Sequence, residues 1–267
     1  MTFLQNRLTL TRFSGLPLTI CLAAVSYFVL LYLSTVLDVT QGGKIVRVDD
    51  ALARFLSDLR TPAIIRFFSI VTAFGYWGVV LALAATVSML LWLDHMPRYL
   101  IGMWVALLGN QISVTLIKAT FARARPDLAY YSESSYSFPS GHSAVSAAFF
   151  GFLIYLVIRE RFASTGTALA IGTLAILAVG MSRLILGEHY LSDVLNGYVV
   201  GALWALLGIW LLERGRLIAD PPMPPPQSRW RNAAKLAVMA VCVIVVWGLV
   251  SHYQHNLPIL PAGRVAP

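Results

Sequence analysis

The chain has 267 residues, 58% of them hydrophobic and only 12% charged, and its formal net charge is +8. Soluble domains carry about 25% charged residues, so this composition excludes an ordinary soluble protein and predicts an integral membrane protein. The basic residues lie mostly in short segments between apolar runs. This pattern indicates topology signals and anion contacts rather than a nucleic-acid surface.

The N-terminal segment, residues 1–37, contains the first predicted span. Residues 18–37 form a nearly unbroken apolar run of about the length that crosses a bilayer, and Pro17 suits the start of a helix. No clear cleavage site accompanies the run, so we expect a retained anchor rather than a signal peptide.

The core of the chain, residues 38–212, begins with a more polar segment. Apolar residues at helical spacing in residues 48–56 predict an amphipathic helix at the membrane interface, interrupted near Pro62. A plain solvated helix fits this pattern equally well. Five further spans are predicted at about residues 70–93, 99–121, 140–158, 165–186 and 190–212.

A basic, proline-rich connector, residues 213–232, separates this core from a C-terminal span and tail, residues 233–267. The predicted fold is therefore all-α, a polytopic transmembrane helix bundle with six core spans and a seventh C-terminal span. Seven spans place the two chain ends on opposite sides of the membrane. With the N-terminus inside, each side holds ten Lys and Arg residues, and setting aside four in the polar segments described next leaves ten inside and six outside. The positive-inside rule then favours an inside N-terminus and an outside location for those segments.

Lys118 lies in the last turn of the third span, and Arg125 follows seven residues later. On a continued helix these two residues would share a face. Arg125 offers a planar fork of donors suited to phosphate, whereas Lys118 is a point charge. Snorkelling of basic side chains at a helix end is the alternative explanation.

The tetrapeptide Pro139-Ser140-Gly141-His142 opens the fourth span. Proline fits the first turn of a helix, and Gly141 lets the backbone approach a ligand. The free N–H groups of a helix start bind anions. The Ser140 hydroxyl adds a donor there, and His142 can transfer a proton. An ordinary helix cap with an isolated histidine remains the alternative.

Ser182 and Arg183 lie near the end of the fifth span, and His189 and Asp193 are spaced i, i+4 on one predicted helical face at the start of the sixth. A carboxylate bonded to one imidazole nitrogen fixes the tautomer and leaves the other nitrogen free to attack. A satisfied interfacial His–Asp pair is one alternative. A metal site is another, but the spacing lacks a zinc-like pattern, and we predict no metal.

Successive spans alternate in direction, so the end of the third span, the start of the fourth, the end of the fifth and the start of the sixth share one membrane face. The span count alone therefore brings to one level Lys118, Arg125, Ser140, His142, Arg183, His189 and Asp193. Fixed cations at this depth indicate an anionic partner.

Together these segments resemble the three-part signature of the type 2 phosphatidic acid phosphatase superfamily: Lys118-x6-Arg125-Pro126, then Pro139-Ser140-Gly141-His142, then Ser182-Arg183-x5-His189-x3-Asp193. The resemblance covers about residues 48–212, and residues 72–75 resemble the family weakly. The seventh span and its connector lie outside this resemblance. Six spans are usual in membrane members of this superfamily, so the seventh span departs from the family pattern.

The resemblance implies a metal-independent phosphomonoester or pyrophosphate hydrolase without a cofactor. It implies that His189 becomes a phosphohistidine, that Asp193 orients it, and that His142 protonates the leaving oxygen. The residues that it implies for holding the phosphoryl oxygens are Lys118, Arg125, Ser140, Gly141 and Arg183.

The depth of the predicted site favours a lipid phosphate substrate of the undecaprenyl pyrophosphate or phosphatidylglycerol phosphate class. A lipid phosphotransferase fits the same motifs, and a non-catalytic lipid-binding or transport protein is a third hypothesis. Membrane lipids are the other expected partners, and the sequence leaves the oligomeric state open. We expect a bacterial inner (plasma) membrane location, with the active site on the outer (periplasmic) face.

Overall fold

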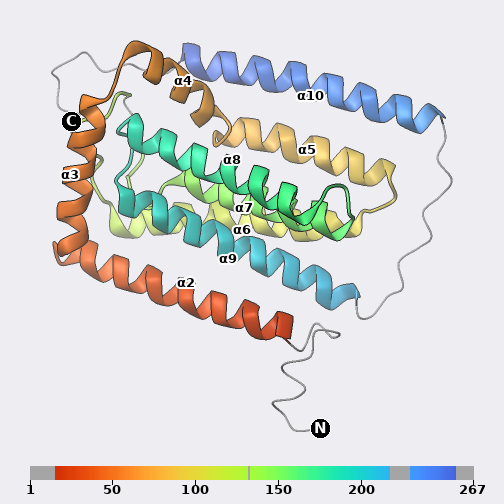
Figure 1. The fold of residues 1–267 in the computed structure, drawn as a ribbon, viewed down its shortest axis with the longest axis horizontal. Helices are drawn as coiled ribbons and strands as arrows, with labels where there is room; N and C mark the ends of the chain where they lie inside the picture. The colour runs from red at the N-terminus through yellow and green to blue at the C-terminus, as the bar shows by residue number, and fades with distance from the viewer. Residues whose placement is uncertain (1–15, 132, 217–228, 257–267) are drawn as a thin grey trace, which may run out of the picture.

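The computed structural model describes residues 16–131, 133–216 and 229–256, and those ranges contain nine α-helices. Most of them lie roughly parallel in one bundle, and α3 crosses one end of it (Figure 1). In chain order they are α2 (Leu16–Thr40), α3 (Lys44–Asp58), α4 (Pro62–Ala73), α5 (Trp77–Leu93), α6 (Arg98–Phe121), α7 (Gly141–Arg159), α8 (Thr165–Ile185), α9 (Leu191–Arg216) and α10 (Arg229–His255).

Five of the described helices, α6 to α10, are long and apolar enough to cross a membrane, and the bent pair of α4 and α5 makes a sixth candidate. The first predicted span falls on α2, and the amphipathic segment falls on α3. The helical path is interrupted near Pro62, as predicted: α3 ends at Asp58 and α4 begins at Pro62. Thr61 caps the start of α4, because its side chain accepts the Ile64 N–H at 3.3 Å.

The second predicted span, residues 70–93, is not one straight helix. It is divided between α4 and α5, which meet at an angle of 46°. The bend contains Gly75, where an added Cβ would lie 2.9 Å from Cβ of His142. Only glycine permits the backbone to come this close to the side chain, so the bend lies directly against a predicted site residue.

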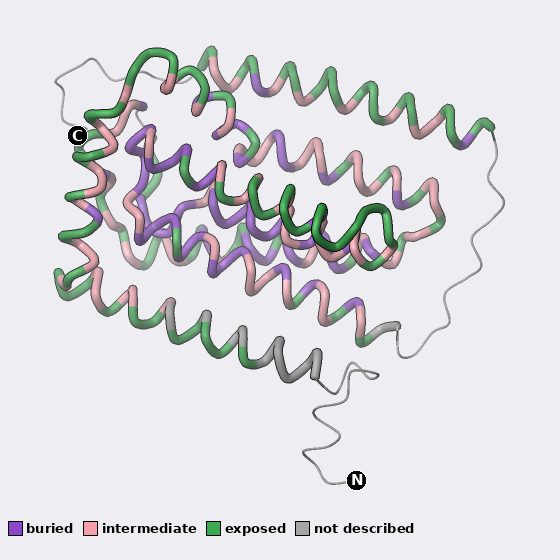
Figure 2. Tube along the Cα trace, in the orientation of Figure 1, coloured by how far each residue is buried: buried purple, intermediate pink, exposed green. Residues whose placement is uncertain are grey.

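The centre of the bundle is α7, which packs against α6, α8 and α9 and carries much of the buried surface in Figure 2. Gly197 and Gly201 bring α9 close to α7. A Cβ at Gly201 would lie 2.1 Å from the Ala144 carbonyl oxygen, and a Cβ at Gly197 would lie 2.6 Å from that of Ser140. Small residues four apart allow such backbone contact between membrane helices. This contact fixes the starts of α7 and α9 relative to each other.

The end of α6, the start of α7, the end of α8 and the start of α9 lie at the same end of the bundle, beside α3 (Figure 1). Hydrogen bonds join these segments, including one from the Ser140 N–H to the Asp193 carbonyl at 3.0 Å. The polar segments that span counting places together are therefore together in space.

Candidate active site

His189 and Asp193 form the centre of the polar cluster. Nδ1 of His189 lies 3.5 Å from Oδ2 of Asp193. Ser137 Oγ lies 3.3 Å from the same nitrogen and donates to Oδ2 at 2.5 Å. The predicted pair meets, but His189 is not on the helix as expected. The reason is that α9 begins only at Leu191, and Asp193 Oδ2 accepts the Tyr190 N–H at 2.9 Å at that helix start.

Further charged side chains hold Asp193 through Oδ1, the carboxylate oxygen that does not face His189. Arg123 donates to Asp193 Oδ1 at 2.6 Å and to Asp49 Oδ2 at 2.9 Å. Asp49, buried on α3, also accepts from the backbone N–H of Ser192 at 2.9 Å and from its hydroxyl at 2.5 Å. Buried carboxylates require such partners. The sequence places Arg123 in a basic patch but does not reveal Asp49, one acid on an amphipathic helix.

Arg125 lies in the connection between α6 and α7, so its predicted shared helical face with Lys118 is wrong. The helix stops because Ala122 adopts a left-handed conformation with a φ of 43°. Arg125 nevertheless reaches the centre of the cluster, since its Nη1 lies 3.3 Å from Nε2 of His189. That nitrogen is the one opposite the carboxylate, so it faces a fixed positive charge.

Arg183 is fully buried on α8 and donates to Thr72 Oγ1 at 2.9 Å and to Glu133 Oε1 at 2.5 Å. The other oxygen of Glu133 accepts from Arg125 Nη2 at 2.5 Å. Burial raises the pKa of Glu133, but the Arg183 and Arg125 guanidinium groups lower it by more, to below its ordinary value. An ionised carboxylate thus lies between two guanidinium groups, a position that equally suits a phosphoryl group. No motif pointed to Glu133.

Glu188 is a second acid beside the arginines, and it is also unpredicted. Its Oε1 accepts the Tyr131 N–H at 2.8 Å. Its Oε2 lies 3.6 Å from Arg125 Nη1 and 3.8 Å from Arg183 Nη2 and makes no hydrogen bond. Burial raises the pKa of Glu188 to about 7, so this side chain gains or loses its charge near neutral pH.

The start of α7 carries the predicted tetrapeptide. Ser140 is the N-cap, and its Oγ accepts from the N–H of Ser143 at 3.4 Å and from its hydroxyl at 2.9 Å. The helix begins at Gly141, so Pro139 precedes the helix and does not lie in its first turn as expected. A Cβ at Gly141 would meet only Val114, at 3.7 Å, which leaves open space beside this backbone.

Several cations act on His189. Burial lowers its pKa well below the ordinary histidine value, and Arg125, Lys118 and Arg183 lower it further. The imidazole is therefore neutral at physiological pH. A neutral ring keeps one nitrogen lone pair available to attack an electrophile.

A hollow of about 490 Å³ opens beside Lys118, Gly141 and His142. Lys118 donates to the Tyr136 carbonyl and to Ser135 Oγ, the latter at 3.4 Å, so its ammonium group faces the α6–α7 connection. The rest of the lining includes the apolar side chains of Trp77, Val114 and Val145. This hollow brings apolar and cationic surface together.

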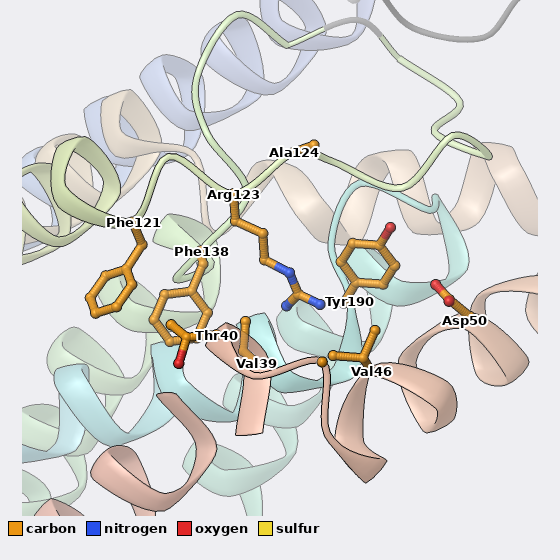
Figure 3. A pocket seen from close by; sticks show the side chains of 10 residues that line it. Val39, Thr40, Val46, Asp50, Phe121, Arg123, Ala124, Phe138 and Tyr190 are labelled. Carbon is orange, nitrogen blue, oxygen red and sulfur yellow. The ribbon is translucent and has the colours of Figure 1, made fainter. Parts of the chain in front are cut away.

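A second hollow, of about 400 Å³, lies between α2, α3 and the α6–α7 connection (Figure 3). Its wall includes Arg123, whose guanidinium carbon lies 4.2 Å from the centre of the Tyr190 ring. Neither histidine of the cluster lines it. The cluster is thus approached from two sides, and only the first hollow reaches His142. Within the described ranges, no group of three or more His, Cys, Asp and Glu side chains is arranged to hold a metal ion.

Comparisons with known proteins place this cluster in a family context. A sequence model of the PAP2 superfamily matches residues 99–217, which include every predicted site residue. The chain is 39% identical over 93 residues to phosphatidylglycerophosphatase B of Bacillus subtilis, covering 33% of this chain and 45% of that protein. It is 34% identical over 114 residues to the lipid A 1-phosphatase of Rhizobium johnstonii, covering 39% and 43%. Each of these two matches therefore spans less than half of the relative's length.

A solved structure extends the comparison to the fold. The crystal structure of a transmembrane PAP2 type phosphatidylglycerolphosphate phosphatase from Bacillus subtilis matches with a TM-score of 0.63 at 23% identity, covering 73% of this chain and 96% of that one. This likeness confirms the predicted all-α transmembrane bundle, and the chain is an integral membrane protein. The three motifs gathered at one end of that bundle all lie within residues 99–217, the part of the chain that matches the PAP2 superfamily.

Proposed function

We propose that this protein is a membrane lipid phosphatase that works through a phosphohistidine on His189. The observation that carries the proposal is the position of His189, whose Nδ1 faces Asp193 at 3.5 Å and whose Nε2 faces Arg125 at 3.3 Å. One side of the ring is thus oriented by a carboxylate, and the other faces a cation that can hold the phosphoryl group under attack.

The proposed reaction has two steps. Nε2 of His189 attacks phosphorus, the bond between phosphorus and the lipid oxygen breaks, and His142 gives that oxygen a proton. Water then attacks the phosphorus of the phosphohistidine, the bond between phosphorus and Nε2 breaks, and His142 takes a proton from that water, which releases inorganic phosphate. Fixed cations replace a metal ion in balancing the developing charge, and we assign that role to Lys118, Arg125 and Arg183, with Ser140 and Gly141 completing the phosphate subsite.

Binding of phosphate requires Glu133 to move, because its carboxylate uses donors of both Arg125 and Arg183. The Ser140 hydroxyl, which caps α7 in the free protein, can serve a phosphate only by donating its own proton. The subsite is therefore filled by the protein's own groups until substrate arrives.

A lipid substrate is supported by the hollow of about 490 Å³, where apolar side chains adjoin Lys118 and His142. We propose undecaprenyl pyrophosphate or phosphatidylglycerol phosphate as the substrate class, with the headgroup at the cations and the chains toward the lipid. Two relatives of this chain, a phosphatidylglycerophosphatase and a lipid A 1-phosphatase, support the same class. We further propose residues 38–212 as the phosphatase core and the outer face of a bacterial inner membrane as the location of the site.

The test uses the purified full-length protein in detergent with a panel of these lipid phosphates and a metal chelator. We expect release of free phosphate with the chelator present and its loss in His189→Ala. Full activity in His189→Ala would refute the assignment, and loss of activity with the chelator would refute the metal-free mechanism. A phosphorylated lipid acceptor without free phosphate would identify a phosphotransferase instead.

A further inference from the structure

The last helix, α10, packs on α4 and α5 and lies outside the region that matches the superfamily, residues 99–217. Most of its residues are exposed in the chain by itself (Figure 2). Near one end Lys235 pairs with Asp94, and near the other Val250 packs with Ala73 and Val79. The second contact lies at the same end of the bundle as the active site (Figure 1).

Tyr253 extends from this helix to the catalytic cluster. Its ring packs on Tyr76 with the ring centres 4.9 Å apart, and its hydroxyl lies 3.4 Å from Nε2 of His142. A second constraint on His142 is the backbone of Gly75, where a Cβ would lie 2.9 Å from the histidine Cβ. His142 is thus confined by the bend between α4 and α5 and by a hydroxyl from α10.

We propose that Tyr253 is a positioning residue that holds His142 for proton transfer, so that the seventh span completes the active site. The inference rests on the proposed phosphatase function, in which His142 gives and takes a proton. The hydroxyl can accept from the Nε2–H of the imidazole in both its protonated form and its neutral form, so a single contact holds the ring through both steps. Occupying one ring nitrogen also fixes the ring and leaves the other nitrogen for substrate.

The surroundings of His142 explain why such a contact matters. The charged and titratable groups that act on it come from α6, the α6–α7 connection, α8 and the connection before α9: Lys118, Arg125, Glu133, Arg183 and His189. All but one of these are cations or imidazoles, and the exception, Glu133, leaves when phosphate binds. A hydroxyl that accepts from the protonated ring favours that charged form, against the surrounding positive charge.

The test compares Tyr253→Phe with wild type by measuring kcat and KM against pH on a lipid phosphate. The variant keeps the ring that packs on Tyr76. We expect kcat about five- to tenfold lower at neutral pH, as for the loss of one hydrogen bond, and KM within about twofold, because the contact acts on proton transfer rather than on ground-state binding. The alkaline limb of the kcat profile should move to lower pH.

The matched control is Tyr198→Phe, which removes a hydroxyl that donates to the Ile176 carbonyl at 3.1 Å and should leave the pH profile unchanged. Thermal unfolding of both variants in detergent reports any loss of folding. An unchanged profile in Tyr253→Phe, or a raised KM with normal kcat, would overturn this inference while the phosphatase function stands. A wild-type protein without turnover would overturn the proposed function and this inference with it.

Discussion

Replacing Glu133 with Gln tests the proposed phosphate subsite directly. The two carboxylate oxygens of Glu133 each lie 2.5 Å from an arginine nitrogen, one on Arg183 and one on Arg125. A phosphoryl group must use the same donors, so Glu133 competes with substrate. Because Glu133→Gln keeps the shape of the side chain and removes its charge, we expect phosphate to bind more tightly in the variant.

The size of the effect follows from the two contacts. Hydrogen bonds to charged groups contribute about 1.5–3 kcal/mol each when they are buried. The Glu133 side chain is 24% exposed, and water screens such pairs, so we assign roughly 1–2 kcal/mol to both contacts together. Since about 1.4 kcal/mol corresponds to a tenfold change, affinity should increase roughly five- to thirtyfold.

Product inhibition by inorganic phosphate is the cleanest assay, because its inhibition constant reports binding without the chemical step. We expect this constant to fall by the stated factor in Glu133→Gln, with KM falling in parallel. Glu213→Gln is the matched control, since Glu213 pairs with Arg159 on helix ends far from the site. A higher inhibition constant together with a large loss of kcat would show that Glu133 assists catalysis instead of competing with phosphate.

Three further predictions concern the groups around the nucleophile. Asp49→Asn should lower kcat about tenfold and destabilise the fold by about 3–5 kcal/mol, the typical effect of breaking a buried ion pair, whereas Asp50→Asn should change neither kcat nor the unfolding temperature. The acid limb of kcat/KM should lie below pH 6.5, because burial and nearby cations lower the pKa of His189. In Arg125→Gln, which removes one of those cations, the acid limb should move to higher pH. An acid limb at the same pH in the variant and the wild type would contradict this account. Burial raises the pKa of Glu188 from 4.5 to about 7, so its contribution to stability is full below pH 4.5 and is lost as pH rises through 7, by about 3 kcal/mol at most. The unfolding temperature of the wild type should therefore fall over this pH range, and Glu188→Gln should flatten that fall. An unchanged slope in the variant would exclude Glu188 as its source.

Much of the fold could be predicted from hydropathy, because a bilayer demands long apolar helices with satisfied backbones. The same rule located Lys118, His142 and Arg183 at one end of the bundle, since alternating spans leave no other arrangement. The bend at Gly75 was not predictable, because residues 70–93 contain no charged residue that would divide the span and the break depends on packing against a residue far along the chain.

Two of the unpredicted site residues, Asp49 and Tyr253, have partners that are distant in sequence. Asp49 meets Ser192 across 143 positions, and Tyr253 meets His142 across 111. Neither has a local pattern that distinguishes it from a solvated acid or an interfacial tyrosine. Helix-end spacing could find the motif residues, but only the tertiary packing identifies the groups that surround them.

The acids around the site account for how it can exist before substrate binds. Four cations and four carboxylates gather here: Lys118, Arg123, Arg125 and Arg183 with Asp49, Glu133, Glu188 and Asp193. On the side of His189 that faces Asp193, the carboxylates of Asp49 and Asp193 permanently offset part of the positive charge. On the side that faces Arg125, Glu133 can move away and Glu188 can take up a proton near pH 7. These two changes leave two uncompensated positive charges, which match a phosphate monoester of about two negative charges. The cluster is therefore balanced when empty and becomes complementary to phosphate when Glu133 leaves and Glu188 is protonated.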